Sequence, residues 1–253
     1  MRSRTVGIPD LDGTEKVAVV IDVMRAFTTA AWAFHLGAER IVLAADADEA
    51  LEIKAGNPGW LALKDGAPAS GFDLVNSPVL IQEFDLTGRT VVQKTTAGTV
   101  GALAVVEAEL ALCASFAVAG ATARALTDAG AESVTLVATG EDGRATEDLA
   151  CAAYLDRLLA AGGGRPTPTP ASAPASAPDP APYLHRARTS PAAEALRTGA
   201  RDGSRPADVD LCCQVDRFDF AMRLGLEDGM AVLRPFRTRQ DTAHAVHREA
   251  THD

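Results

Sequence analysis

The chain has 253 residues, a formal net charge of −10 and 47% hydrophobic residues, which suits one α/β domain, or two small ones, with a sizeable core. The acidic balance argues against nucleic acid or an anionic membrane as a partner, because either would need a basic surface. No apolar run reaches the ~18 residues of a membrane helix, and the start of the chain lacks a secretory signal pattern, so we expect a cytoplasmic protein.

Short apolar runs alternate with helix-like stretches from Val17 onward. Runs rich in Val, Ile and Leu predict strands, and apolar residues at helical spacing predict helices. The alternation predicts an α/β fold with a mostly parallel sheet, helices on both faces and a smaller C-terminal α+β segment. The expected strands are Val17–Ile21, Arg40–Ala44, Trp60–Leu63, Thr90–Gln93, Leu110–Cys113 and Val134–Ala138; the expected helices are Met24–Leu36, Asp46–Gly56, Ala117–Ala129, Glu147–Ala161 and Ser190–Thr198.

Residues 162–182 differ in composition from the rest of the chain and read GGGRPTPTPASAPASAPDPAP. This segment offers almost no apolar surface to bury and its prolines lack amide donors, so it predicts a linker or surface insertion. We therefore divide the chain into an α/β core with most of the site motifs (1–161), the linker (162–182), a C-terminal segment that completes the fold (183–236) and a disordered tail (237–253).

Polar residues follow the predicted strands at the points where the strands end. Asp22 and Arg25 follow the first strand, and Asp65 follows the third. The run KTTAGT begins at Lys94 after the fourth strand, and TGEDGRATED begins at Thr139 after the sixth. Ligands of open α/β sheets bind beyond the carboxyl ends of the strands. We therefore expect a polar binding site at one edge of the sheet.

Acids form the anionic half of this expected site. Carboxylates suit Mg²⁺, which needs few protein ligands when waters and a substrate phosphate complete its shell. Structural explanations stay open, since Asp73 suits the cap of a turn, and Glu147 and Asp148 suit the first turn of a helix. The candidate magnesium ligands are Asp22, Asp65, Asp73, Glu147, Asp148 and Asp216.

Arginines and a threonine-rich loop form the cationic half. The guanidinium fork of Arg25, Arg144 or Arg217 fits phosphate or sulfonate oxygens. The loop from Thr95 to Thr99 adds hydroxyls, a glycine and backbone amides, which suit a phosphate. A strand-to-helix turn with a threonine cap explains this loop equally well. The spacing of a P-loop and the glycines of a dinucleotide-binding motif are both absent from the sequence.

The chain carries several stretches in the order of a known family: VVIDVMRAFTT, GFDLVNSP, KTTAGT, TGEDGRATEDLACAA and LCCQVDRFDF, between Val17 and about Phe220. Together they resemble the 2-phosphosulfolactate phosphatases. The resemblance implies an α/β fold and a magnesium-dependent hydrolase that converts 2-phosphosulfolactate to sulfolactate and phosphate. It implies a small phosphorylated acid as the substrate, and a homodimer is compatible with the sequence.

The resemblance also implies roles for single residues. Asp22 is then a metal ligand or the nucleophile, and Arg25 clamps the anion beside it, so this pair is the catalytic prediction. A haloacid-dehalogenase-type phosphatase is disfavoured, because Met24 stands where that type has a second acid. The candidate substrate-binding residues are Asn76, Thr95, Thr96, Gly98, Thr99, Arg144 and Arg217.

The chain departs from the family pattern in three places. Lys64 and Asp65 stand where the family has Gly-Glu, and Ala97 replaces an asparagine. Ala193 and Glu194 stand where the family has Gly-Arg. The first change shortens an acid, and the other two remove an asparagine and an arginine, which are donors that a sulfonate needs. The alternative function is therefore a catalytically impaired member that binds an anionic metabolite as a sensor or partner.

Overall fold

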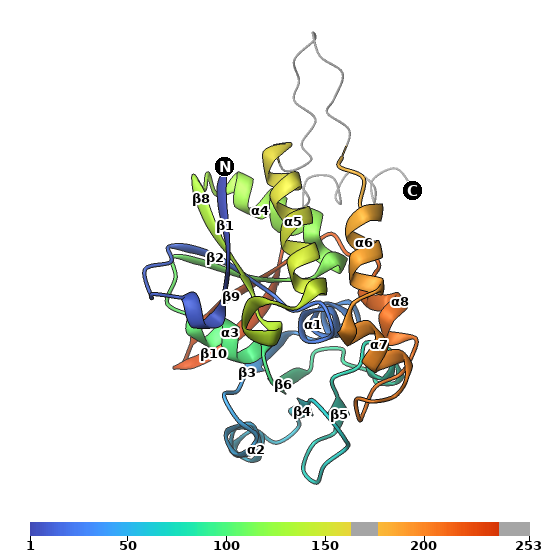
Figure 1. The fold of residues 1–253 in the computed structure, drawn as a ribbon. Coiled ribbons are helices and arrows are strands. Elements are labelled where there is room, and N and C mark those ends of the chain that lie inside the picture. The colour runs from blue at the N-terminus through green and yellow to red at the C-terminus, as the bar shows by residue number, and fades with distance from the viewer. Residues whose placement is uncertain (163–176, 238–253) are drawn as a thin grey trace, which may run out of the picture.

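The computed structural model describes residues 1–162 and 177–237. In this part of the chain one ten-stranded sheet has the order β1-β8-β2-β7-β9-β10-β3-β6-β4-β5 (Figure 1). The strands are β1 (Arg2–Gly7), β2 (Val17–Ile21), β3 (Arg40–Leu43), β4 (Leu61–Lys64), β5 (Leu74–Val75), β6 (Thr90–Lys94), β7 (Leu110–Ala114), β8 (Ser133–Ala138), β9 (Ala221–Glu227) and β10 (Met230–Phe236).

The sheet consists of two parallel groups joined by an antiparallel hairpin. β1, β8, β2 and β7 run parallel in the first group, and β3, β6, β4 and β5 run parallel in the second. β9 and β10 pair antiparallel with each other. β9 also pairs antiparallel with β7, and β10 with β3. The predicted α/β fold with a mostly parallel sheet is thus confirmed, and the C-terminal segment supplies the antiparallel strands.

Two helices, α2 and α7, begin at a residue whose side chain caps them. Asp46 caps α2 by accepting the N–H of Glu49 at 2.9 Å, and Ser190 caps α7 by accepting the N–H of Ala193 at 3.1 Å. None of the helices in the described ranges is long and apolar enough to cross a membrane. The α-helices are α1 (Ala26–His35), α2 (Ala47–Gly56), α3 (Gly98–Ala104), α4 (Ala119–Asp128), α5 (Thr146–Ala160), α6 (Ala181–Arg188), α7 (Pro191–Arg197) and α8 (Asp208–Cys212).

Each of the six predicted strands matches an observed strand with bounds that differ by at most one residue. The pattern does not predict β1, whose sequence RSRTVG is largely polar and lies at the edge of the sheet. The pattern also does not predict β9 and β10 as two separate strands of a hairpin. The two strands are joined by Asp228 and Gly229, which have φ of 51° and 79°. An Asp-Gly pair with positive φ is typical of a tight hairpin turn.

The segment that positions the site runs from β2 into α1. Residues Ala18 to Ile21 are completely buried, and every residue of α1 from Ala26 to Phe34 is buried as well. Most of these residues are apolar, and the two threonines, Thr28 and Thr29, are completely buried as well, so α1 is enclosed on all sides. The short loop between β2 and α1, which carries Asp22 and Arg25, is therefore fixed at both ends by the core.

The predicted linker and tail fall mostly outside the described residues. Helix α6 begins at Ala181, so the last two residues of the predicted linker belong to a helix. Residues 163–176 and 238–253 lie outside the described ranges, and the domain boundaries stay predictions.

Candidate active site

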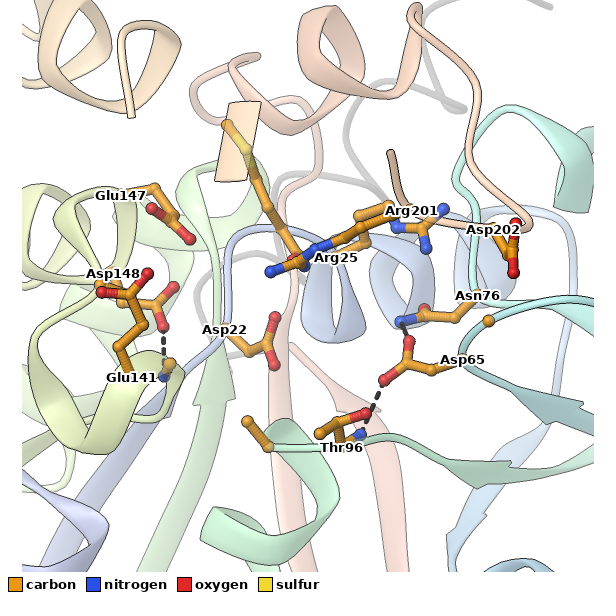
Figure 2. Close-up of a pocket in the computed structure, with 15 residues that line it drawn as sticks. Asp22, Arg25, Asp65, Asn76, Thr96, Glu141, Glu147, Asp148, Arg201 and Asp202 are labelled. Atoms are coloured by element: carbon orange, nitrogen blue, oxygen red, sulfur yellow. Dashed lines mark hydrogen bonds between the residues drawn. The ribbon is translucent and has the colours of Figure 1, made fainter. Parts of the chain in front are cut away.

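A pocket of about 490 Å³ opens where several strands end (Figure 2). Its walls come from the loops that follow β2, β4, β5, β6 and β8, from the first turn of α5 and from the segment between α7 and α8. The expectation that polar residues at strand ends meet in one site is therefore correct for these loops. The polar and charged residues that line the pocket are Asp22, Arg25, Asp65, Asn76, Thr96, Glu141, Glu147, Asp148, Arg201 and Asp202.

Asp22 is the first residue after β2, and only 8% of its surface is exposed. Its Oδ1 accepts the N–H of Ala26 at 3.0 Å, and its Oδ2 accepts the hydroxyl of Thr139 at 3.3 Å. Burial, and then the negative charge of Asp65, raises the pKa of Asp22 to about 7. Asp22 thus holds the start of α1 and still lines the pocket, so its structural and chemical roles coexist.

Gly98 lets the loop after β6 approach this carboxylate closely. A Cβ on Gly98 would lie 2.8 Å from Oδ2 of Asp22 and 2.6 Å from the Cβ of Ala26. No side chain fits in that space without a shift of the surrounding atoms. Gly98 therefore brings two strand ends together, although it does not line the pocket itself.

Asp148 and Glu147 enter from the first turn of α5. Asp148 accepts the N–H of Val23 at 2.8 Å and that of Gly140 at 2.9 Å, so it ties the loop after β2 to the loop after β8. Burial and the charges of Asp22 and Glu147 raise the pKa of Asp148 well above its ordinary value. Burial also raises the pKa of Glu147. The pocket thus has one wall of buried acids that repel one another.

Arg25 lies on an adjacent wall and is 4% exposed. Its Nη1 donates to Oδ2 of Asp208 and to the carbonyl of Gly203, both at 3.0 Å. Asp208 is completely buried and also accepts the hydroxyl of Ser77 at 2.6 Å. The guanidinium of Arg25 is therefore held in place by segments far away in the sequence.

The loop after β6 is less open to a ligand than the sequence suggests. Asp65 accepts the backbone N–H of Thr96 at 2.7 Å and the side-chain amide of Asn76 at 2.6 Å. Thr95 and Thr99 are buried and bond to each other, since each hydroxyl accepts the other residue's N–H at 3.0 Å. Both threonines thus stabilise the turn, as the capping alternative predicts. The backbone N–H of Thr96 already donates to the Asp65 carboxylate and is not free to bind a phosphate.

Two other predicted site residues, Asp73 and Arg144, lie outside the pocket. Asp73 accepts the N–H of Ala62 at 2.8 Å and pairs with Lys54 at 2.7 Å. Arg144 is exposed and lies 3.6 Å from Asp142. The placement of Asp73 agrees with its structural alternative, a local cap.

Asp216 and Arg217 also lie outside the pocket, and they line a different hollow. Asp216 accepts the N–H of Gly120 at 2.6 Å, and the guanidinium of Arg217 lies 5.7 Å from the ring centre of Trp32. Asp216 therefore faces the start of α4, and Arg217 faces an aromatic cluster.

The whole described site lies within a segment that matches known proteins. The family described as 2-phosphosulpholactate phosphatase matches residues 6–225. The chain belongs to this family. A relative from Carboxydothermus hydrogenoformans, named probable 2-phosphosulfolactate phosphatase, is 31% identical over 232 residues, which cover 88% of this chain and 92% of the relative.

Two further relatives in the 2-phosphosulfolactate phosphatase family carry the same name. The one from Thermus thermophilus is 34% identical over 202 residues, 79% of this chain and 84% of the relative. The one from Bacillus subtilis is 34% identical over 145 residues, 56% of this chain. That match covers 64% of the Bacillus protein, so the chain spans slightly less than two thirds of it.

The sequence patterns do not indicate several residues that line the pocket of this family member or hold its walls in place. Asp208 forms the ion pair with Arg25. Asp210 lies two positions later, and nothing in the sequence shows which of the two acids pairs with Arg25. Arg201 and Asp202 belong to the stretch ARDGSRP, whose glycine, proline and charges indicate only a loop. Glu141 lies in the run TGEDGRATED, where the sequence does not distinguish it from the neighbouring acids.

The residues of this pocket are compatible with a magnesium ion only if few of its ligands come from the protein. Within residues 1–162 and 177–237, no three His, Cys, Asp or Glu side chains gather in a way that could hold a metal ion. Yet the pKa of Asp22 is raised by burial and by the charges of Asp65 and Glu147, so a cation would relieve the repulsion. The residues therefore suit Mg²⁺ bound through one or two carboxylates and do not suit an all-protein cage.

Proposed function

We propose that the protein is a magnesium-dependent phosphatase that hydrolyses 2-phosphosulfolactate to sulfolactate and phosphate. The observation that carries this proposal is the meeting of Asp22 and Arg25 at one pocket, with buried acids beside Asp22. Family membership and the names of the relatives support the substrate. Phosphoryl transfer needs positioning and charge neutralisation more than covalent chemistry from the protein.

Asp22 and Glu147 are the residues that would hold the cation. Asp22, Glu147 and Asp148 all line the pocket, but both carboxylate oxygens of Asp148 accept backbone amides, whereas among the described residues Oδ2 of Asp22 accepts only the Thr139 hydroxyl at 3.3 Å. When bound, Mg²⁺ would neutralise charge on the phosphate and orient it. Asp148 ties the loop that carries Asp22 to the loop before α5, whose first turn carries Glu147, so its role is to position the two ligands.

Arg25 binds the phosphate oxygens from the neighbouring wall. Because Asp208 and Gly203 fix its Nη1, the guanidinium lies ready before substrate arrives. Preorganised charge of this kind costs no rearrangement during the reaction. In the reaction a water oxygen bonds to phosphorus and the ester P–O bond breaks; one proton of the water ends on the sulfolactate hydroxyl and the other stays on the released phosphate.

The test is the release of inorganic phosphate from a panel of phosphorylated hydroxy acids, each with Mg²⁺ and with excess chelator. The proposal predicts turnover of 2-phosphosulfolactate with Mg²⁺ and none with chelator. Turnover in excess chelator would remove the magnesium assignment. Tight binding of the panel without turnover under any condition would favour the sensor function instead.

A further inference from the structure

The segment between α7 and α8 brings a second arginine to the pocket. Arg201 lines it, and its Nη1 donates to the carbonyl of Met24 at 3.3 Å. Figure 2 shows Arg201 beside Arg25 at this pocket, and the positive charge of Arg201 also acts on Glu147, where it opposes the rise in pKa that burial causes. Arg201 is exposed, whereas Arg25 is buried, so Arg201 lies nearer to solvent.

The two arginines differ in how their charge is balanced. Arg25 forms a buried ion pair with Asp208 at 3.0 Å. Among the described residues, Arg201 has no carboxylate within the 4.0 Å of an ion pair, and its one side-chain hydrogen bond goes to a neutral carbonyl. Its charge is therefore available to a ligand. If the phosphate of the substrate binds at Arg25, Arg201 remains available to bind a second anionic group of the same substrate molecule.

We propose that Arg201 binds the sulfonate of the substrate and thereby selects phosphate esters that carry this second anionic group. This inference rests on the proposed function. In 2-phosphosulfolactate the carboxylate is attached directly to the ester carbon, whereas the sulfonate is one methylene further away. The group that reaches further from the phosphate suits the arginine nearer to solvent. A guanidinium can give a sulfonate two parallel hydrogen bonds.

Arg201 also supplies positive charge that the departures from the family pattern remove. The family resemblance implies an asparagine at the position of Ala97 and an arginine at that of Glu194, so both differences remove donors. Ala97 lines the pocket, so a donor is absent there. Glu194 lies in α7 and pairs with Arg197 at 3.7 Å. A cation that enters from the following loop restores positive charge to the pocket.

The experiment measures binding of the product sulfolactate by titration calorimetry, which needs no turnover. The variant is Arg201→Gln, and the matched control is Arg205→Gln in the same loop. Arg205 is exposed, donates to the carbonyl of Ser204 at 3.1 Å and does not line the pocket. Both variants lose one positive charge from the same segment.

The proposal predicts that Arg201→Gln weakens sulfolactate binding roughly 10- to 100-fold, the loss typical of a charge-assisted hydrogen bond, and that Arg205→Gln leaves it unchanged. Lactate, which has a carboxylate and no sulfonate, should bind the wild type and Arg201→Gln equally. An equal loss for lactate would assign Arg201 to the carboxylate and overturn the sulfonate proposal. Equal losses in both variants would show a diffuse charge effect and overturn it too.

Turnover separates this inference from the proposed function. If the wild type hydrolyses 2-phosphosulfolactate and Arg201→Gln binds sulfolactate normally, the function stands and the inference falls. If sulfolactate binds through Arg201 and no phosphate is ever released, the inference stands and the proposed hydrolysis falls. A wild-type protein that does not bind sulfolactate at all overturns the inference.

Discussion

Arg25 Nη1 lies 3.0 Å from Asp208 Oδ2, and neither side chain exposes more than 3% of its surface. This ion pair joins the start of α1 to the start of α8, two segments far apart in the sequence. It fixes the guanidinium at the wall of the pocket and leaves little freedom for its position. In the proposed function Asp208 therefore decides where the phosphate binds, although it does not line the pocket itself.

Asp208→Asn should destabilise the protein strongly. The variant leaves the buried Arg25 without a counter-charge, a loss that typically costs about 3–5 kcal/mol. The free energy of unfolding in urea measures this cost. The control is Asp210→Asn, because Asp210 pairs with Arg188 at the surface and such pairs contribute at most about 1 kcal/mol. Similar stability of the two variants would show that the buried pair is not needed for the fold.

Arg25→Lys should reduce activity far more than it reduces stability. Lysine keeps the positive charge beside Asp208 but cannot offer the planar fork to a phosphate. A lost contact of this kind is worth roughly 30- to 1000-fold in kcat/KM. Arg40→Lys, at a partly exposed ion pair with Glu227, is the control and should keep wild-type kinetics. Wild-type turnover in both variants would remove Arg25 from the site.

Gly98→Ala should disturb the carboxylate of Asp22. The new Cβ would lie 2.8 Å from Oδ2 and 2.6 Å from the Cβ of Ala26, so one of the two loops must move. Overpacking of this kind costs about 1–3 kcal/mol, and displacement of Asp22 should also lower kcat. Gly225→Ala is the control, because a Cβ there meets no atom within 4 Å. If the two variants behave alike, the close approach of Gly98 is unimportant.

The stability of the metal-free protein should fall as the pH rises from about 4 to about 7. Asp22 has its pKa raised from 3.8 to about 7, so over this range the unfolded chain releases the proton while the folded protein keeps it. The contribution of Asp22 to the free energy of unfolding is fully present below about pH 4 and is lost above about pH 7. Asp22→Asn should reduce this slope in chelator-containing urea titrations, whereas Asp46→Asn, which alters an exposed helix cap, should not. An unchanged slope in Asp22→Asn would contradict the raised pKa.

Much of the fold and part of the site could be predicted from local patterns. β2 is a short apolar run that ends at Asp22, and the carboxyl end of a parallel strand is where ligands bind, so the location of Asp22 followed from sequence. The same rule correctly brought Asp65, Thr96 and Glu147 to the pocket.

The rule gives no direction for residues of the C-terminal segment. Asp216 precedes β9, which runs antiparallel to β7, and its carboxylate caps the start of α4 instead of facing the pocket. Arg201 and Asp208 reach the site only through tertiary packing of a loop whose local sequence indicates no more than a turn. Sequence spacing cannot show which of several acids in such a loop becomes the buried partner of Arg25.

The role of Asp22 is tested by comparing wild type and Asp22→Asn in the hydrolysis of 2-phosphosulfolactate, with Mg²⁺ and with excess chelator. Asparagine keeps the shape of the side chain and can still cap α1, so the fold should survive, which circular dichroism checks. The account predicts magnesium-dependent phosphate release by the wild type and a loss of at least roughly 100-fold in kcat/KM for the folded variant. Equal turnover by the two proteins with Mg²⁺ would contradict the assignment of Asp22 as the carboxylate around which the site is built.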